Sequence, residues 1–292
     1  MLWIILTAAA APLQVARNAL QRGLVGDAGP WGATLVRFLF GLPFSIAMFA
    51  VVSLLTPDAH PDPSVRFWEA VVIGAVAQMA ATGFLLLTMH RSGFAVATVM
   101  QQSSLPLAAV LGVFLGDALP AQAWGGVAIA TVGLVTLSWP KPKDVKGSPS
   151  GAMSGLASGL AFAVALNGYR KAGLALDAGH PIYSALGSLG CAQVIQSVLL
   201  GGILFAVRRE ALRAVMASWK PSLGAGFFGS AASACWFGAL ALAPAGPVRA
   251  VGVIEAPIAA AVGRRLFLEK LSPRQWVGGA LTTVGVVLTV LR

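Results

Sequence analysis

Glu255 is the only carboxylate that lies deep inside an apolar stretch of this sequence, which makes it the first candidate for chemistry. A carboxylate in apolar surroundings can bind an ammonium group or carry a proton, because burial disfavours its charged form. The alternative is a structural role, in a hydrogen bond or an ion pair with Arg37 or Arg249. We therefore expect Glu255 either to contact a bound solute or to join two helices.

Amide and hydroxyl side chains gather in a second apolar stretch, where Gln101-Gln102-Ser103-Ser104 comes just before Pro106. Consecutive helical residues point in different directions, so only some of these side chains can face one cavity. We slightly prefer Gln101 over Gln102 as a lining residue. Hydrogen bonding between neighbouring helices is the alternative role for the whole run.

Other polar and aromatic side chains within apolar stretches could line the same cavity. Gln78 and Thr82 are four residues apart and share one helical face. Trp236 could stack on a ligand or bind a cation, or serve in ordinary packing. Arg37 could hold a carboxylate, extend to a membrane surface or fix the packing of two helices. The remaining candidates are Asn18, Phe162, Asn167, Gln193 and Gln196.

No pattern in the sequence indicates catalysis, a metal or a cofactor. The three histidines, His60, His90 and His180, fall in connectors without metal-ligand spacing, and we expect them to be solvated. The sequence has no H-E-x-x-H, G-x-S-x-G or phosphate-binding motif. We therefore expect no catalytic residue, no metal and no cofactor, and an intramembrane enzyme is the least favoured reading.

The elements that would position these side chains are membrane-spanning helices. Hydrophobic residues make up 57% of the chain and charged residues 10%, against roughly 25% charged in a soluble domain. The net charge of +10 comes largely from short basic connectors, which set membrane orientation and do not indicate nucleic-acid binding. Cys191 and Cys235 lie in apolar stretches and are expected to be packing residues rather than a disulfide.

We predict an all-α polytopic membrane protein with ten transmembrane helices. A hydrocarbon core of about 30 Å requires roughly 20 helical residues per span. Apolar stretches of that size lie at 2–22, 31–55, 67–89, 93–115, 120–139, 150–172, 182–207, 215–241, 244–266 and 271–291. The basic connector 140–149 then separates a first five-helix repeat, 1–139, from a second, 150–292.

An internal repeat supports this division. The segment Leu119–Gly126 matches Leu271–Gly278, with Trp124 opposite Trp276 at an offset of 152 residues. The match continues at the same offset, with Thr131-Val132-Gly133 opposite Thr283-Val284-Gly285. Because each half holds an odd number of spans, the halves should enter the membrane in opposite directions, as two inverted repeats.

The repeated motifs resemble the EamA-type branch of the drug/metabolite transporter superfamily. That family carries two copies of a five-helix unit, each with a proline in its fourth helix, a following acidic residue and later glycines. The matching residues here are Arg37, Pro106, Asp117, Trp124, Gly126, Gly133, Glu255, Pro257, Glu269, Gln275, Trp276, Gly278 and Gly285. The chain departs from the family pattern where Ala256 separates Glu255 from Pro257 and where Asp117 replaces the usual glutamate.

The resemblance implies a secondary transporter of the bacterial inner membrane. Within the branch, the chain is most similar to exporters of aromatic amino acids of the YddG-like type. That likeness implies export of amino acids or related metabolites by alternating access at a central cavity, with protons as a candidate coupling ion. A broad exporter of drugs and cations is the main alternative, and a channel or scaffold is another. We expect a monomer in a lipid bilayer, without a nucleic-acid partner, because two repeats complete a pathway in one chain.

Overall fold

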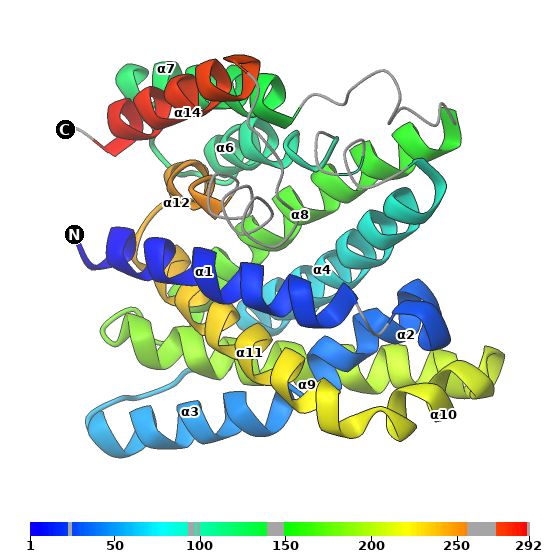
Figure 1. Ribbon diagram of the computed structural model, residues 1–292. Coiled ribbons are helices and arrows are strands. Elements are labelled where there is room, and N and C mark those ends of the chain that lie inside the picture. Colours follow the sequence, from blue (N-terminus) through cyan, green and yellow to red (C-terminus); the bar gives the residue numbers. More distant parts are fainter. Residues whose placement is uncertain (23–24, 93–96, 98–99, 139–148, 256–272, 291–292) are drawn as a thin grey trace. The chain divides into compact units, whose positions relative to one another are not determined.

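The protein is described by a computed structural model for residues 1–22, 25–92, 97, 100–138, 149–255 and 273–290, all of them in helices, turns or short connectors (Figure 1). Within these residues there is no strand, which confirms the all-α prediction. The basic connector lies almost entirely outside the described residues. The chain forms two compact units, of which unit 1 comprises Met1–Met79 and Ala165–Ala243, and unit 2 comprises Ala80–Val164 and Pro244–Arg292.

Each unit draws on both halves of the sequence. Two helices, α4 (Val65–Ser92) and α8 (Pro149–Leu176), contribute to both units. Unit 1 also contains α1 (Leu2–Arg22), α2 (Val25–Leu39), α3 (Leu42–Leu55), α9 (Pro181–Val207), α10 (Arg209–Ala217) and α11 (Trp219–Leu242). Unit 2 also contains α6 (Ser104–Phe114), α7 (Ala121–Ser138), α12 (Ala245–Gly252) and α14 (Pro273–Val290).

Most of these helices begin and end within a few residues of the predicted spans. The predicted spans 93–115 and 244–266 are described only in part, through α6 and α12, because 93–96, 98–99 and 256–272 lie outside the described residues. Two further regions differ. The expected span 31–55 is divided into α2 and α3 at Phe40–Gly41, because Pro43 in the first turn of α3 has no N–H to bond backwards. The expected span 215–241 begins later, at Trp219, because α10 precedes it. That short helix has Glu210 in its first turn and buries Val215.

Four helical stretches are long and apolar enough to cross a membrane. They are Ala28–Leu55, Val65–Met89, Pro181–Val207 and Trp219–Leu242. Their outer faces carry apolar side chains that water would not favour, including Leu54 at 83% exposure and Val207 at 75%. Shorter apolar helices occur at Leu2–Arg17, Ser104–Phe114, Ala121–Thr136 and Trp276–Thr289.

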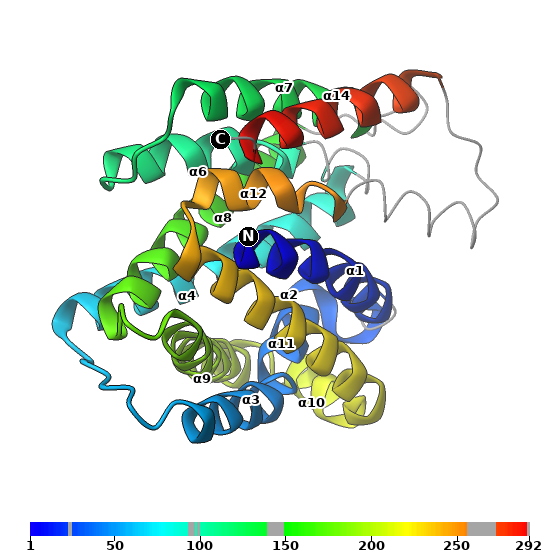
Figure 2. The same cartoon turned by 90° about the vertical axis from the view of Figure 1, so that its left-hand side faces the viewer.

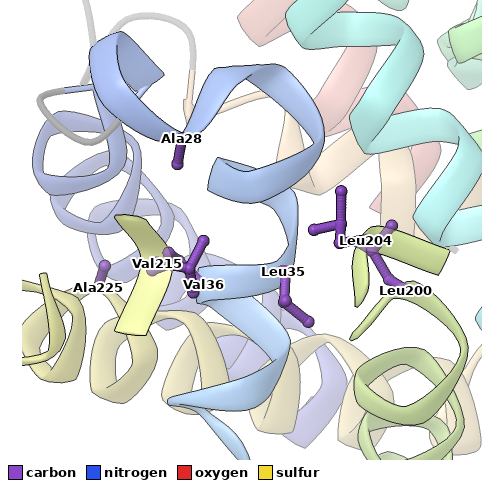
Figure 3. Close-up of a cluster of buried hydrophobic side chains, with 7 residues drawn as sticks. All are labelled: Ala28, Leu35, Val36, Leu200, Leu204, Val215 and Ala225. Carbon is purple, nitrogen blue, oxygen red and sulfur yellow. The ribbon is translucent and has the colours of Figure 1, made fainter. Parts of the chain in front are cut away.

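The interior of unit 1 is held in part by a cluster of buried aliphatic side chains (Figure 3). Leu35 and Val36 of α2 lie between α9 and α10, where they meet Leu204 and Val215. Each of these four side chains is at most 3% exposed. The cluster positions α2, and with it Arg37, against α9 and α11.

In unit 2, helices α7 and α14 lie side by side (Figures 1 and 2). Their backbones approach so closely that a Cβ on Gly133 would lie 2.9 Å from the carbonyl oxygen of Gly278. A Cβ on Gly285 would lie 2.7 Å from the carbonyl oxygen of Gly126. The earlier residue of α7, Gly126, meets the later residue of α14, Gly285, and the later Gly133 meets the earlier Gly278, so the two helices are antiparallel. Small residues allow this approach, which is the usual way helices pack in lipid.

Candidate functional site

Buried and half-buried polar groups of unit 1 gather near the middle of the four long apolar helices. Gln78 lies near the centre of Val65–Met89, and Gln193 and Gln196 near the centre of Pro181–Val207. Ser230 and Ser233 lie near the centre of Trp219–Leu242, and Arg37 and Gly41 within about one turn of the centre of Ala28–Leu55. Polar groups at this depth are costly in lipid unless protein or water satisfies them. We call this set the polar core of unit 1.

One part of the polar core is a three-residue cluster between α4, α8 and α9. The hydroxyl of Tyr169 donates to Gln78 Oε1 at 2.9 Å. The amide Nε2 of Gln196 lies 2.9 Å from Gln78 Oε1, 3.1 Å from the Tyr169 hydroxyl and 3.1 Å from the Ala75 carbonyl oxygen. Gln196 is 1% exposed and Tyr169 is 2% exposed. We name Gln78, Tyr169 and Gln196 the amide–tyrosine cluster.

Two features of the chain place Tyr169 in this cluster. Gly74 of α4 leaves room for the ring, since a Cβ there would lie 2.7 Å from Tyr169 Cε1. On its other side, the Tyr169 ring packs against Phe237 of α11 with 4.0 Å between centroids and a tilt of 33°. A tyrosine held this way presents an apolar body to the core and a hydroxyl to the amides.

A second part of the polar core joins α9 to α11 and to the turn between α2 and α3. Gln193 Nε2 donates to Ser230 Oγ at 3.0 Å, and Ser230 Oγ donates to the Gly41 carbonyl oxygen at 2.7 Å. Ser230 Oγ also lies 3.4 Å from Gln193 Oε1. The single Ser230 proton is shared between the Gly41 carbonyl oxygen and, at longer range, Gln193 Oε1, so this contact joins α9, α11 and the turn between α2 and α3.

Arg37 is the cation of the polar core. Its guanidinium Nη2 donates to Ser233 Oγ at 3.2 Å, and the side chain is only 5% exposed. The stems of Arg37 and Arg17 both pack over Gly229, where a Cβ would lie 3.3 Å from each. Two buried guanidinium groups beside hydroxyl and amide groups suit an anionic group such as a carboxylate.

Unit 2 contains a pair of interrupted helices at corresponding positions of the two halves. Helical structure breaks into turns at Gln102–Ser103 and at Val253–Ile254, and the two turns match at the 152-residue offset within one residue. Backbone bonds at both places span three residues instead of four, as in Leu105 N to Gln102 O and Ile254 N to Val251 O. Pro106 explains the first break, because it cannot donate to the carbonyl of residue 102.

Arg249 joins the two interrupted segments of unit 2. Its Nε donates to Ser104 Oγ at 3.2 Å and its Nη2 to Gln102 Oε1 at 3.4 Å. Arg249 is 8% exposed and interacts electrostatically with the half-buried Glu255. The role of Glu255, as a solute-binding carboxylate or as a structural partner of Arg249, stays a prediction. Interrupted helices with charged and amide groups at the break are typical of solute and ion sites in transporters.

The other predicted site residues are distributed over both units. Trp236 is 9% exposed, and its indole Nε1 donates to Gln14 Oε1 at 3.0 Å. Asn167 is 2% exposed in unit 1, and Thr82 is 6% exposed in unit 2. Gln101 and Phe162 are half-buried in unit 2. Asn18 belongs to α1, but its side chain lies outside the described part of the chain.

Three members of these contacts were not predicted from the sequence. Tyr169, Ser233 and Arg17 are buried and lie in apolar helices. The sequence did offer one signal for Tyr169. The chain has only two tyrosines, and a tyrosine hydroxyl that is buried usually has a hydrogen-bond partner. Ser233 gave no signal, since serine in an apolar helix commonly bonds its own backbone.

Among the described side chains, no histidine or cysteine belongs to the polar core of unit 1 or to the Arg249 contacts of unit 2. His60 is exposed, whereas His180 departs from the prediction, because its ring Nδ1 lies 3.0 Å from Asp177 Oδ2. The side chain of His90 is outside the described residues. Cys191 and Cys235 are free, as predicted. Among the described residues, no three His, Cys, Asp or Glu side chains converge as metal ligands.

An apolar pocket of about 410 Å³ lies in unit 1 between α1, α3, α9 and α11. Met48 and Val52 of α3 and Ile182 and Leu186 of α9 line the pocket. Cys235 and Gly238 of α11 complete this lining. A lining of this kind suits hydrocarbon and offers a polar solute no hydrogen bond.

Comparisons with known proteins place the fold but give no family. No family model and no curated protein matches the chain. Among solved structures, 21 chains match. One of them, described only as "Crystal structure of protein", matches with a TM-score of 0.72 and 14% identity, over 99% of this chain and 97% of that one. The chain therefore shares its fold with a crystallised protein. At this identity the likeness extends to the fold alone.

Proposed function

We propose that the protein is a secondary transporter that exports small metabolites, most of all amino acids, across the bacterial inner membrane. Its ten transmembrane helices form two inverted five-helix repeats, and a cavity between the repeats opens to each side in turn. The observation that carries the proposal is the polar core of unit 1, at mid-length of four helices long enough to span a bilayer. Polar groups at that depth mark solute pathways in membrane proteins.

The repeat geometry supports the inverted arrangement. Helices α7 and α14 are matched at the 152-residue offset, and they pack antiparallel through matched glycines. The breaks at Gln102–Ser103 and Val253–Ile254 are matched in the same way. Duplicated transporters place broken helices of both repeats around the binding site. One chain then supplies a complete pathway, and we propose that it acts as a monomer in the bilayer.

The chemistry of the polar groups favours amino acids over cationic drugs. A multidrug exporter of cations needs an available carboxylate beside aromatic rings. Here Glu255 already interacts with Arg249, and the polar core of unit 1 offers amides, hydroxyls and the guanidinium of Arg37. A zwitterion can satisfy both kinds of group at once. We propose a carrier rather than an enzyme, with protons as the candidate coupling ion and no cofactor or nucleic acid.

Uptake into proteoliposomes tests the proposal. Purified protein is reconstituted and offered a panel of labelled amino acids, with and without a preset pH gradient, and separately a cationic dye. We expect saturable amino-acid uptake that falls by about 10-fold or more in Gln78→Leu, because the buried partners of Gln78 lose their acceptor. The matched control is Gln122→Leu, which makes the same change at an exposed position of α7. Dye movement without amino-acid uptake would replace the proposal with a multidrug exporter.

A further inference from the structure

The amide of Gln196 has one atom that the described structure leaves without a hydrogen-bond partner. Its Oε1 is buried and accepts no hydrogen bond from any described group, although the residue is only 1% exposed. Its Nε2, in contrast, lies within bonding distance of three oxygen atoms. Folded proteins leave few buried polar atoms unsatisfied, and each one requires an explanation.

The orientation of this amide is determined by its surroundings. The Ala75 carbonyl oxygen can only accept, so the Gln196 atom 3.1 Å from it must be the nitrogen. Turning the amide over would place two acceptor oxygens against each other. The unsatisfied atom is therefore an acceptor, and a donor is needed to complete the amide–tyrosine cluster.

No hydrogen bond from another member of the cluster reaches that atom. The one proton of the Tyr169 hydroxyl is used in the bond to Gln78 Oε1. The two protons of Gln196 Nε2 are already shared among three oxygens. The neighbouring amide of Gln193 differs, because both its oxygen and its nitrogen face Ser230 Oγ. Gln193 thus serves a structural contact, whereas Gln196 retains a capacity to bind.

We propose that Gln196 Oε1 accepts a hydrogen bond from the amino group of the transported solute, and so selects amino acids over their deaminated analogues. An ammonium group is a strong donor and carries the charge that a carbonyl oxygen stabilises. Arg37, which donates to Ser233 Oγ and is 5% exposed, lies in the same polar core and suits the carboxylate of the same molecule. This inference rests on the proposed transport of amino acids and adds the group that distinguishes them from other acids.

Ligand-induced thermal stabilisation tests the inference on the whole purified protein. The probes are two matched pairs, L-phenylalanine with hydrocinnamate and L-leucine with isocaproate, which differ only by the amino group. In the wild type, we expect each effective amino acid to half-saturate the Tm shift at a concentration at least about 10-fold lower than its deaminated partner does, because the partner leaves the acceptor unmatched.

Two variants separate selection from packing. Gln196→Met keeps the length of the side chain and removes the acceptor, and we expect the discrimination to fall to within about 2-fold. Ser158→Ala removes a buried hydroxyl of unit 2 that donates to the Ala81 carbonyl oxygen at 2.8 Å, outside the polar core, and should lower the Tm of the free protein while keeping the discrimination. The wild-type comparison stands alone if either variant fails to fold.

The outcomes distinguish this inference from the proposed function. Equal binding of an amino acid and its deaminated partner to the wild type, or full discrimination in Gln196→Met, would overturn the role of Gln196 and leave transport intact. If neither L-phenylalanine nor L-leucine raises the Tm, and the proteoliposome panel shows no amino-acid uptake, the proposed function fails and the inference fails with it.

Discussion

Gly133 of α7 and Gly285 of α14 occupy matched places in one helix pair, although 152 residues separate them in the sequence. Gly133 of α7 faces Gly278 of α14, and Gly285 of α14 faces Gly126 of α7. Because Gly133 corresponds to Gly285 and Gly126 to Gly278, exchanging the two helices turns one contact into the other. An exchange of this kind is what a two-fold axis between the helices produces. The repeated sequence and the antiparallel contact therefore describe one feature, the approach of two equivalent helices through small residues.

Replacing a glycine of this pair should disrupt unit 2. Gly285→Leu places a side chain against the backbone of Gly126 and Ala130, and we expect a loss of about 3 kcal/mol from this overpacking. The matched control is Gly279→Leu on the same helix, where a Cβ meets nothing within 4 Å. Thermal unfolding in detergent measures both. Equal Tm values for the two variants would contradict the close contact between α7 and α14.

Arg249 and Glu255 should be energetically coupled. Arg249→Gln and Glu255→Gln each remove one charge, and the double variant removes both. We expect the double variant to lose about 0.5–3 kcal/mol less stability than the sum of the losses in the two single variants. Each single variant leaves one charge without its partner, whereas the double variant leaves neither charge. A double-mutant cycle of thermal stabilities measures this difference. A loss of stability in the double variant that equals the sum of the two single losses would show that Arg249 and Glu255 are not coupled.

Gly74 should control transport through the position of Tyr169. A Cβ at residue 74 would press on the Tyr169 ring, so Gly74→Ala should displace the hydroxyl from Gln78. We expect uptake into proteoliposomes to fall on the order of 10-fold, since misplacing one polar group by a fraction of an ångström is costly. Gly190→Ala is the control, because its Cβ meets nothing within 4 Å. Unchanged uptake in Gly74→Ala would remove Tyr169 from the functional site.

The loop at Asp177 should respond to acid. Desolvation raises the pKa of Asp177, but hydrogen bonds from His180 and from the N–H groups of His60 and Gly179 outweigh it, and the pKa lies below its ordinary value. A group with a lowered folded-state pKa stabilises the fold above its unfolded pKa of about 4, and loses that effect as the pH falls through the folded value.

Asp177→Asn therefore should lower the Tm slightly at pH 7 and make no difference in strong acid. Thermal unfolding of the wild type and the variant across an acid pH series measures the gap between them. The gap should close as the pH decreases below the pKa of Asp177. A gap that widens towards acid pH would contradict the assigned hydrogen bonds.

The sequence was sufficient to predict where helices lie and which of them carry polar groups. Apolar stretches bounded by polar connectors predict α1 and α9 closely, because length and composition alone decide a span. The buried Gln193 and Arg37 and the half-buried Gln78 were recognised as polar residues within apolar helices for the same reason. The break at Gln102–Ser103 was not predicted, because the stretch 93–115 was expected to form one continuous helix in spite of Pro106.

The contacts between helices could not be predicted in the same way. A helix that is apolar on all sides offers no periodic pattern that identifies its buried face. The sequence therefore could not show that Gln102 is the amide that contacts Arg249, and the slight preference for Gln101 as a lining residue stays a prediction. Tyr169 was missed because its role depends on the space left by Gly74 on another helix. The Phe40–Gly41 turn also lay hidden within one apolar stretch.

Counter-transport of an amino acid tests the central claim most directly. Proteoliposomes containing the protein are preloaded with unlabelled L-phenylalanine or L-leucine and diluted into the same labelled amino acid, with no ion gradient. An alternating-access carrier should accumulate label transiently above equilibrium, and Gln78→Leu should abolish the overshoot while Gln122→Leu keeps it. Flux that never saturates and shows no overshoot would contradict the account, because a channel, unlike a carrier, does not couple entry of one solute to exit of another.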